Sequence, residues 1–254
     1  MNTTPTRLAV ADITATLVTH FDLPALLERI ATTALNGFDA RIVVISLLEG
    51  DALHAVATSA VGDVVTDDRL FTTGPVLTSA RETAVAMIGD VTVPGTGRWE
   101  SYRTLAQSSG MGAVRAYPIA SLGVGLGSLA VHTANPWGSE RPDELGQMLA
   151  DLASLALTTS TTDVRRTDGT SAVQSVLNGA AAISGATGVL AEYFGDSTTE
   201  ARIRLARLAR AHGTTDSKHA AAIIAAQNVA PADIGSSELI HLPKAPVPPR
   251  RFDS

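Results

Sequence analysis

A heptad repeat near the C-terminus constrains the fold of this chain more than any other feature of its sequence. Its members are apolar or small, alternate in spacings of 3 and 4 residues, and comprise Val173, Val176, Ala180, Ile183, Thr187, Leu190 and Phe194. Such spacing places them on one stripe of an α-helix. Ala180 and Thr187 stand where a strong coiled coil would have Leu or Ile. We therefore predict a thin homodimer seam that needs help from other helices, comprising Val173, Val176, Ala180, Ile183, Leu190 and Phe194.

Two shorter helices are predicted after this stripe. Gly195 breaks the first helix, and a second begins at residues 197–199 with Glu200 in its first turn. One face of the second helix carries Ala201, Leu205, Leu208, Ala209 and His212, whereas the other carries Arg202, Arg204, Arg207 and Arg210. Gly213 ends that helix, and an apolar run over residues 220–224 completes a three-helix unit.

Residues 183–224 resemble the ANTAR domain, an RNA-binding antiterminator module. The positions that match are Ala186, Gly188, Leu190, Ala201, Leu205, Ala209, His212, Ala220, Ile223 and Ile224. The resemblance implies that RNA hairpins are bound by Thr187, Gly188, Arg202, Arg204, Arg207, Arg210, His212 and Lys218. The sequence departs from the family pattern at Thr187, Ala191, Asp216 and His219. Because of these departures, the alternative that the three-helix unit has lost RNA binding stays open.

The arginine-rich face has two interpretations from the residues alone. It fits a solvated helix surface, and it equally fits a surface that grips phosphates and stacks on unpaired bases through planar guanidinium groups. The nearby aromatic residues are Tyr193 and Phe194. Residues 165–226 carry 7 Lys or Arg and 5 Asp or Glu, whereas residues 1–164 carry 9 Arg and 17 Asp or Glu. The negative charge of the chain therefore belongs to its N-terminal part, and the basic helix is the part suited to nucleic acid.

The first 160 residues alternate between helical and strand patterns. We predict helices over residues 8–20, 22–37, 74–81, 102–109 and 140–158, and strands over 41–48, 52–60, 83–88, 113–122 and 127–133. Residues 49–51 form the turn of a hairpin between the first two strands. This order predicts an α+β sensor domain with an antiparallel five-stranded sheet and helices packed on one face, followed by the all-α three-helix output domain.

Residues 1–160 resemble a GAF domain. The resemblance rests on Gly74-Pro75 opening a helix, the strand that ends in Gly89-Asp90-Val91, Trp99 after a short loop, and the strands at 112–119 and 127–131. It implies a pocket between the sheet and the helical segment that connects the second strand to the third. We predict that this pocket is lined by Leu77, Met87, Trp99, Arg115 and Tyr117 and takes an unidentified small molecule. The alternative is a dimerising scaffold that holds no ligand.

Two segments connect or follow these domains. Residues 161–170 are rich in Ser, Thr and Asp and fit a short linker, or part of one continuous helix. We assign residues 171–226 to the output domain. The tail over residues 227–254 contains Pro231, Pro243, Pro246, Pro248 and Pro249. So much proline predicts an extended or disordered tail.

Several function classes are disfavoured by composition. The chain has no Cys, so it lacks thiolate metal ligands, a Cys nucleophile and the Cys that catalytic and chromophore-bearing GAF domains need. Its 6 His residues include no His-x-x-x-His pair, and Gly123-x-Gly-x-Gly127 lies between two strands and fits a hairpin turn. The apolar run over residues 113–131 is interrupted by Arg, Pro and Gly, so no membrane span is predicted. We predict no enzymatic activity, catalytic residue, cofactor or metal.

The sequence therefore predicts a cytoplasmic homodimeric regulator that binds RNA hairpins in nascent transcripts and antagonises termination. The alternative is a ligand-responsive protein-interaction module.

Overall fold

The structure is a computed structural model that describes residues 3–19, 21–62, 67–95, 97–139, 141, 143–159, 169–229 and 231–243. The chain forms two compact units, Met1–Ala180 and Ala181–Ser254. The boundary therefore falls inside the helix that carries the heptad repeat. Residues 161–168 of the predicted linker lie outside the described residues, and residues 169–170 already belong to that helix.

A five-stranded antiparallel sheet forms the centre of the first unit. Its strands are β1 (Ile42–Glu49), β2 (Ala52–Ala60), β3 (Ala86–Ile88), β4 (Ala113–Ser121) and β5 (Val124–Thr133), in the order β2-β1-β5-β4-β3. The apolar runs of β1, β4 and β5 are buried on both faces, as expected of strands at the middle of a covered sheet. The predicted α+β class and five-stranded sheet are confirmed.

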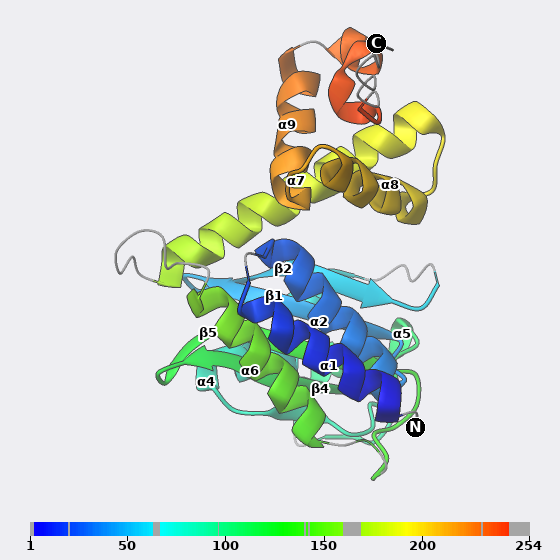
Figure 1. Ribbon diagram of the computed structural model, residues 1–254. Coiled ribbons are helices and arrows are strands. Elements are labelled where there is room, and N and C mark those ends of the chain that lie inside the picture. The colour runs from blue at the N-terminus through cyan, green and yellow to red at the C-terminus, as the bar shows by residue number, and fades with distance from the viewer. Residues whose placement is uncertain are drawn as a thin grey trace, which may run out of the picture. The chain divides into compact units, whose positions relative to one another are not determined.

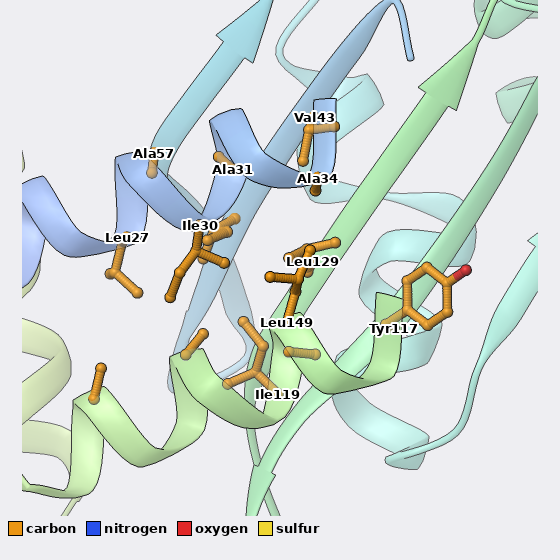
Figure 2. Close-up of a cluster of buried hydrophobic side chains, with 14 of the residues drawn as sticks. Leu27, Ile30, Ala31, Ala34, Val43, Ala57, Tyr117, Ile119, Leu129 and Leu149 are labelled. Carbon is orange, nitrogen blue, oxygen red and sulfur yellow. The ribbon is translucent and has the colours of Figure 1, made fainter. Parts of the chain in front are cut away.

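Three long helices lie on one side of the sheet: α2 (Leu23–Phe38) and α6 (Asp143–Thr159) pack on the strands, and α1 (Thr3–Leu17) packs on α2 and α6 (Figure 1). Alternate residues of the strands point toward them, including Val43, Tyr117 and Leu129. Figure 2 shows these side chains meeting Ile30 of α2 and Leu149 of α6. Each of these five residues is at most 1% exposed, so apolar burial holds the helices to the sheet.

Three shorter helices cover the opposite face: α3 (Arg69–Thr72), α4 (Gly74–Glu82) and α5 (Glu100–Ser108). Their apolar side chains Leu70, Val76 and Ala106 pack against the sheet and are fully buried. The prediction that helices pack on one face only is therefore wrong. The apolar strands require cover on both sides, because their successive side chains point to opposite faces.

The second unit is a bundle built from the C-terminal part of α7 (Gly169–Phe194) with α8 (Thr198–Ala211) and α9 (Asp216–Val229). Helix α8 begins with a capping box, in which the Ser197 hydroxyl accepts from the Glu200 N–H and the Glu200 carboxylate accepts from the Ser197 N–H. The predicted apolar face of α8 is confirmed, because Ala201, Leu205, Leu208 and Ala209 are at most 3% exposed.

The chain continues beyond α9 as ordered structure. Two 3₁₀ helices, η1 (Pro231–Ser236) and η2 (Glu238–Ile240), follow it, and Ile234 and Ile240 are buried in the bundle core. The prediction of an extended or disordered tail is therefore wrong for residues 231–240. Two isoleucines and a leucine in this stretch give the segment apolar surface to bury, which the proline count did not reveal. Residues 244–254 lie outside the described residues.

Candidate functional site

The layer between the sheet and helices α3 to α5 contains an unusual concentration of buried hydroxyl groups. Ser46 on β1 and Ser128 on β5 are paired across the sheet, and both are completely buried. The Ser46 hydroxyl donates to the Phe71 carbonyl at 2.8 Å, and the Ser128 hydroxyl donates to the Val76 carbonyl at 3.0 Å. Ser79 of α4 donates in the other direction, to Ala116 on β4 at 3.1 Å. These bonds hold α3 and α4 over the sheet, because a buried polar group without a hydrogen-bond partner lowers stability.

Tyr102 and His132 form the ionisable pair of this layer. The Tyr102 hydroxyl lies 2.8 Å from Nε2 of His132 and 3.2 Å from the Leu70 carbonyl. A hydroxyl has one proton, so it donates to the carbonyl and accepts from a His132 ring that is protonated on Nε2. Gly74 allows Tyr102 to approach, because its φ of 60° suits glycine and an added Cβ would overlap the tyrosine ring.

Burial controls the titration of both members of the pair. It lowers the pKa of His132 from its ordinary 6.5 to about 4, an effect that the Leu70 and Ile42 carbonyls offset in part. Burial also raises the pKa of the Tyr102 hydroxyl above its ordinary value. The pair is therefore neutral at physiological pH, and it can accept or donate a hydrogen bond without carrying charge.

The predicted pocket residues lie on two different faces of the sheet. Leu77 and Trp99 lie in the α3 to α5 layer, where the Trp99 indole N–H donates to the Thr78 hydroxyl at 3.1 Å. Tyr117 instead lies in the core under α2 and α6, where it is 1% exposed. Met87 and Arg115 are paired across β3 and β4, with an Arg115 guanidinium nitrogen 2.9 Å from the Met87 sulfur.

Arg115 shares the face of Tyr117, because the two residues are separated by one position on a strand. Its guanidinium carbon lies 5.1 Å from the centre of the Trp137 ring, and Trp137 packs against the same core. The prediction that Leu77, Met87, Trp99, Arg115 and Tyr117 line one pocket is therefore wrong. The strand period of two separates them, whereas Tyr102 and His132 were not predicted to belong to the site. A polar His at the end of the apolar run 129–131 was the available signal.

Three of the predicted RNA-binding cations are exposed on the second unit. Arg207 and Arg210 lie on α8, Lys218 lies on the neighbouring α9, and all three are exposed. Arg202 is partly buried. Arg204 contacts its own chain: its guanidinium bonds Asp196 at 2.6 Å, and its central carbon lies 4.0 Å from the centre of the Phe194 ring.

Thr187 and Gly188 occupy different environments although they are neighbours. Thr187 is 8% exposed, and its hydroxyl donates to the Ile183 carbonyl one turn earlier at 2.8 Å. It therefore faces the bundle core and is not placed to contact RNA, contrary to the prediction. Gly188 is exposed, and a Cβ added there would meet nothing within 4 Å among the described residues.

The predicted dimer seam is buried within a single chain. Val176 packs in the core of the first unit, and Ile183 and Leu190 pack in the core of the second, each at most 1% exposed. Ala180 and Phe194 are partly buried against these same cores, and the side chain of Val173 lies outside the described residues. The predicted dimer seam is therefore wrong for Val176, Ile183 and Leu190, because the heptad spacing at these positions reflects packing within the chain.

His212 and His219 form a stacked pair at the end of α8 and the start of α9. Their ring centres are 4.9 Å apart with an angle of 26° between the planes. Nε2 of His219 lies 2.9 Å from the Leu239 carbonyl, and Nε2 of His212 lies 2.9 Å from the His241 carbonyl. Burial lowers the pKa of His219. His212 therefore binds the chain's own segment 231–243 in this structure.

Comparison with known proteins identifies the first unit. The sequence profile of the GAF domain matches residues 22–157. The chain belongs to the GAF domain family. It therefore contains a ligand-sensing signalling module, whose sheet and helices are those described above. The match ends before α7, so the second unit lies outside it.

Solved structures have the same fold. The phycocyanobilin-bound GAF domain from a cyanobacterial phytochrome matches with a TM-score of 0.51 and 15% identity, over 63% of this chain and 98% of that one. Free methionine-R-sulfoxide reductase from Neisseria meningitidis matches with a TM-score of 0.50 and 18% identity, over 63% and 92%. No curated protein sequence matches the chain.

Within the described residues, no helix combines the length and the apolar character that crossing a membrane requires.

Proposed function

We propose that this protein is a cytoplasmic, signal-responsive regulator without catalytic activity. Its GAF domain binds a small-molecule effector, and its C-terminal bundle binds RNA hairpins in nascent transcripts and antagonises transcription termination. The observation that carries the proposal is the exposure of three cations, Arg207, Arg210 and Lys218, on two helices that pack together. Residues 1–164 carry 9 Arg and 17 Asp or Glu, so these cations stand out against an acidic background.

The chemistry of these cations suits a hairpin better than a regular duplex. Guanidinium groups bind phosphates through two parallel hydrogen bonds and also stack on unpaired bases, which hairpin loops present. Arg204 contributes indirectly, because it is engaged with Asp196 and Phe194 and so holds the start of α8 against the end of α7. The RNA contacts are therefore assigned to Arg207, Arg210 and Lys218.

The test is a filter-binding titration of the full chain against pooled cellular RNA, followed by selection of the hairpins retained. Arg207→Ala removes one exposed cation while leaving the core intact. For a selected hairpin, the slope of log affinity against log salt should shrink by about 0.7 for each phosphate that the variant no longer neutralises. Arg41→Ala is the matched control, since it removes an exposed arginine from the GAF unit. Equal slopes for intact protein and Arg207→Ala would exclude the arginine face from the RNA site.

A second candidate function is a protein-interaction module. It is favoured by the chain's own segment 231–243, which is seated on the bundle as a bound peptide would be. Under this alternative the effector controls access of a partner's peptide to that surface. Failure of the pooled RNA to bind, together with binding of a labelled peptide of residues 231–243, would favour this alternative over the first.

We also propose that the protein is a homodimer that associates through α6. Met148 and Leu155 are two helical turns apart and are 41% and 47% exposed, so they offer an apolar stripe on the outer face of that helix. Leu155→Asp places a charge on this stripe. Light scattering should then report a monomer with an intact fold, and an unchanged mass would exclude α6 from the interface.

A further inference from the structure

The segment 231–243 is attached to the bundle by apolar side chains and also by backbone carbonyls and aromatic rings. The Leu239 carbonyl lies 2.9 Å from Nε2 of His219, and the His241 carbonyl lies 2.9 Å from Nε2 of His212. Nε2 of His241 lies 2.8 Å from the Gly235 carbonyl and so closes the segment on itself. Carbonyls accept only, so each of these three rings carries its proton on Nε2.

The same segment contacts the two aromatic rings at the end of α7. The His241 ring lies 6.4 Å from both Tyr193 and Phe194, at angles of 78° and 83° to their planes. The backbone at Gly235 packs on Tyr193 so closely that an added Cβ would lie 2.8 Å from the ring. The segment therefore takes up one side of Tyr193, which is still 45% exposed, and part of the surface of Phe194.

We propose that segment 231–243 is an intramolecular competitor of RNA, an inference that rests on the function proposed above. An unpaired base needs a ring or guanidinium face to stack on. Tyr193, Phe194 and the stacked His212–His219 pair supply such faces beside α8, and His212 is one of the residues implied in RNA binding. Because the segment lies on one side of Tyr193 and occupies the Nε2 edges of His212 and His219, RNA reaches those surfaces only when the segment leaves.

The segment has few buried anchors, which makes its release feasible. Among its residues of described burial, Ile234 and Ile240 are buried at 9% and 1% exposure and Leu239 is partly buried, whereas Glu238, His241 and Leu242 are exposed. Segments with little buried apolar surface open at lower free energy than the core to which they attach. RNA binds only to molecules from which the segment is released. The apparent RNA affinity is therefore the intrinsic affinity multiplied by the fraction of released molecules.

The test uses the full chain carrying His241→Ala. This change removes the ring that contacts Tyr193 and Phe194 and the bond to Gly235, but leaves the bundle histidines in place. If intact protein is open in about one molecule in ten, the affinity for a selected hairpin should rise about fivefold to tenfold. Leu242→Ala is the matched control, because it changes the exposed next residue and should leave the affinity unchanged.

A second readout follows the segment directly. The chain has no Cys, so Glu238→Cys gives a single site for a spin label. The label should become more mobile when RNA is added and when His241→Ala is introduced. If His241→Ala does not release the segment, Ile240→Ala removes its most buried anchor and takes its place in the binding titration.

The outcomes separate this inference from the proposed function. RNA binding that is tighter in the released variant supports competition, as does disappearance of that increase when excess peptide 231–243 is added in trans. RNA binding that is equal in intact and released forms overturns the inference but leaves RNA as the partner. Absence of RNA binding by every form overturns the proposed function and this inference with it.

Discussion

The Tyr102 hydroxyl and Nε2 of His132 lie 2.8 Å apart in a fully buried contact between helix α5 and strand β5. The rings of His132 and Phe71 of α3 are also nearly perpendicular, at 78°, with ring centres 6.0 Å apart. His132 therefore joins helices α5 and α3 to β5, the central strand of the sheet. Because it is neutral when folded, protonation of this ring opposes the packed arrangement of the whole layer.

We predict that the GAF unit loses stability in mild acid because of His132. Its pKa is 6.5 ordinarily and about 4 when folded, so the unfolded chain binds the proton more tightly. The neutral His132 ring makes its full contribution to the stability of the GAF unit above pH 6.5, and this contribution is lost as pH falls toward about 4. A shift of this size corresponds to about 3 kcal/mol. Urea unfolding followed by Trp emission reports this unit, since both Trp residues, Trp99 and Trp137, belong to it.

The matched variant is His132→Phe, which keeps an aromatic ring but does not titrate. Tyr102 retains the Leu70 carbonyl as acceptor in that variant. Its unfolding free energy should vary much less between pH 6.5 and 4 than that of the intact protein. Parallel pH profiles for the two proteins would show that His132 is not the source of the acid sensitivity.

The sequence predicted the sheet well because strand burial leaves a direct signature. The apolar run at residues 41–48 and the hairpin turn at Glu49 to Asp51 place β1 and β2 correctly, and the glycine-rich turn after Leu122 joins β4 to β5. The site was predicted poorly because lining a pocket depends on which face each side chain takes. Tyr117 and Ala116 are adjacent, yet they belong to opposite layers.

In the bundle, helical spacing predicted which positions are apolar and buried but not which residues cover them. Its core positions, such as Leu205 and Ile223, follow from helical spacing and are fully buried. The heptad stripe was assigned to a partner chain because spacing identifies an apolar stripe without identifying what covers it. Here Ile183 is covered by the chain's own helices. The tail was assigned to disorder because its proline count outweighed Ile234 and Ile240, whose burial depends on residues distant in sequence.

We predict that Gly146→Ala destabilises the GAF unit. Gly146 lies on α6 against the ring of Tyr117, and an added Cβ would overlap that ring. Because Tyr117 is 1% exposed and enclosed by the core, it has little room to move. Overpacking of this kind costs about 1 to 3 kcal/mol. Urea unfolding monitored by Trp emission measures the decrease in stability.

Gly188→Ala is the control for that experiment. It makes the same change inside another helix, at a site where an added Cβ meets nothing within 4 Å among the described residues. Alanine should stabilise that helix by about 0.5 to 1 kcal/mol relative to glycine, as measured by far-UV circular dichroism, and should leave the Trp-monitored transition of the GAF unit unchanged. A Gly146→Ala variant that is as stable as the intact protein would mean that α6 shifts to admit the methyl group.

The final prediction distinguishes a stripe packed inside the chain from a dimer seam. Ile183→Asp and Ser184→Asp introduce the same charge at adjacent positions of α7, but Ile183 is 1% exposed whereas Ser184 is exposed. An unpaired carboxylate in the bundle core costs several kcal/mol, roughly, so Ile183→Asp should unfold the second unit. Far-UV circular dichroism should then lose helical signal while Trp emission from the GAF unit stays unchanged. Ser184→Asp should retain both signals. If Ile183→Asp keeps its helical signal and light scattering reports only a lower mass, Ile183 contacts a second copy and not the core of its own chain.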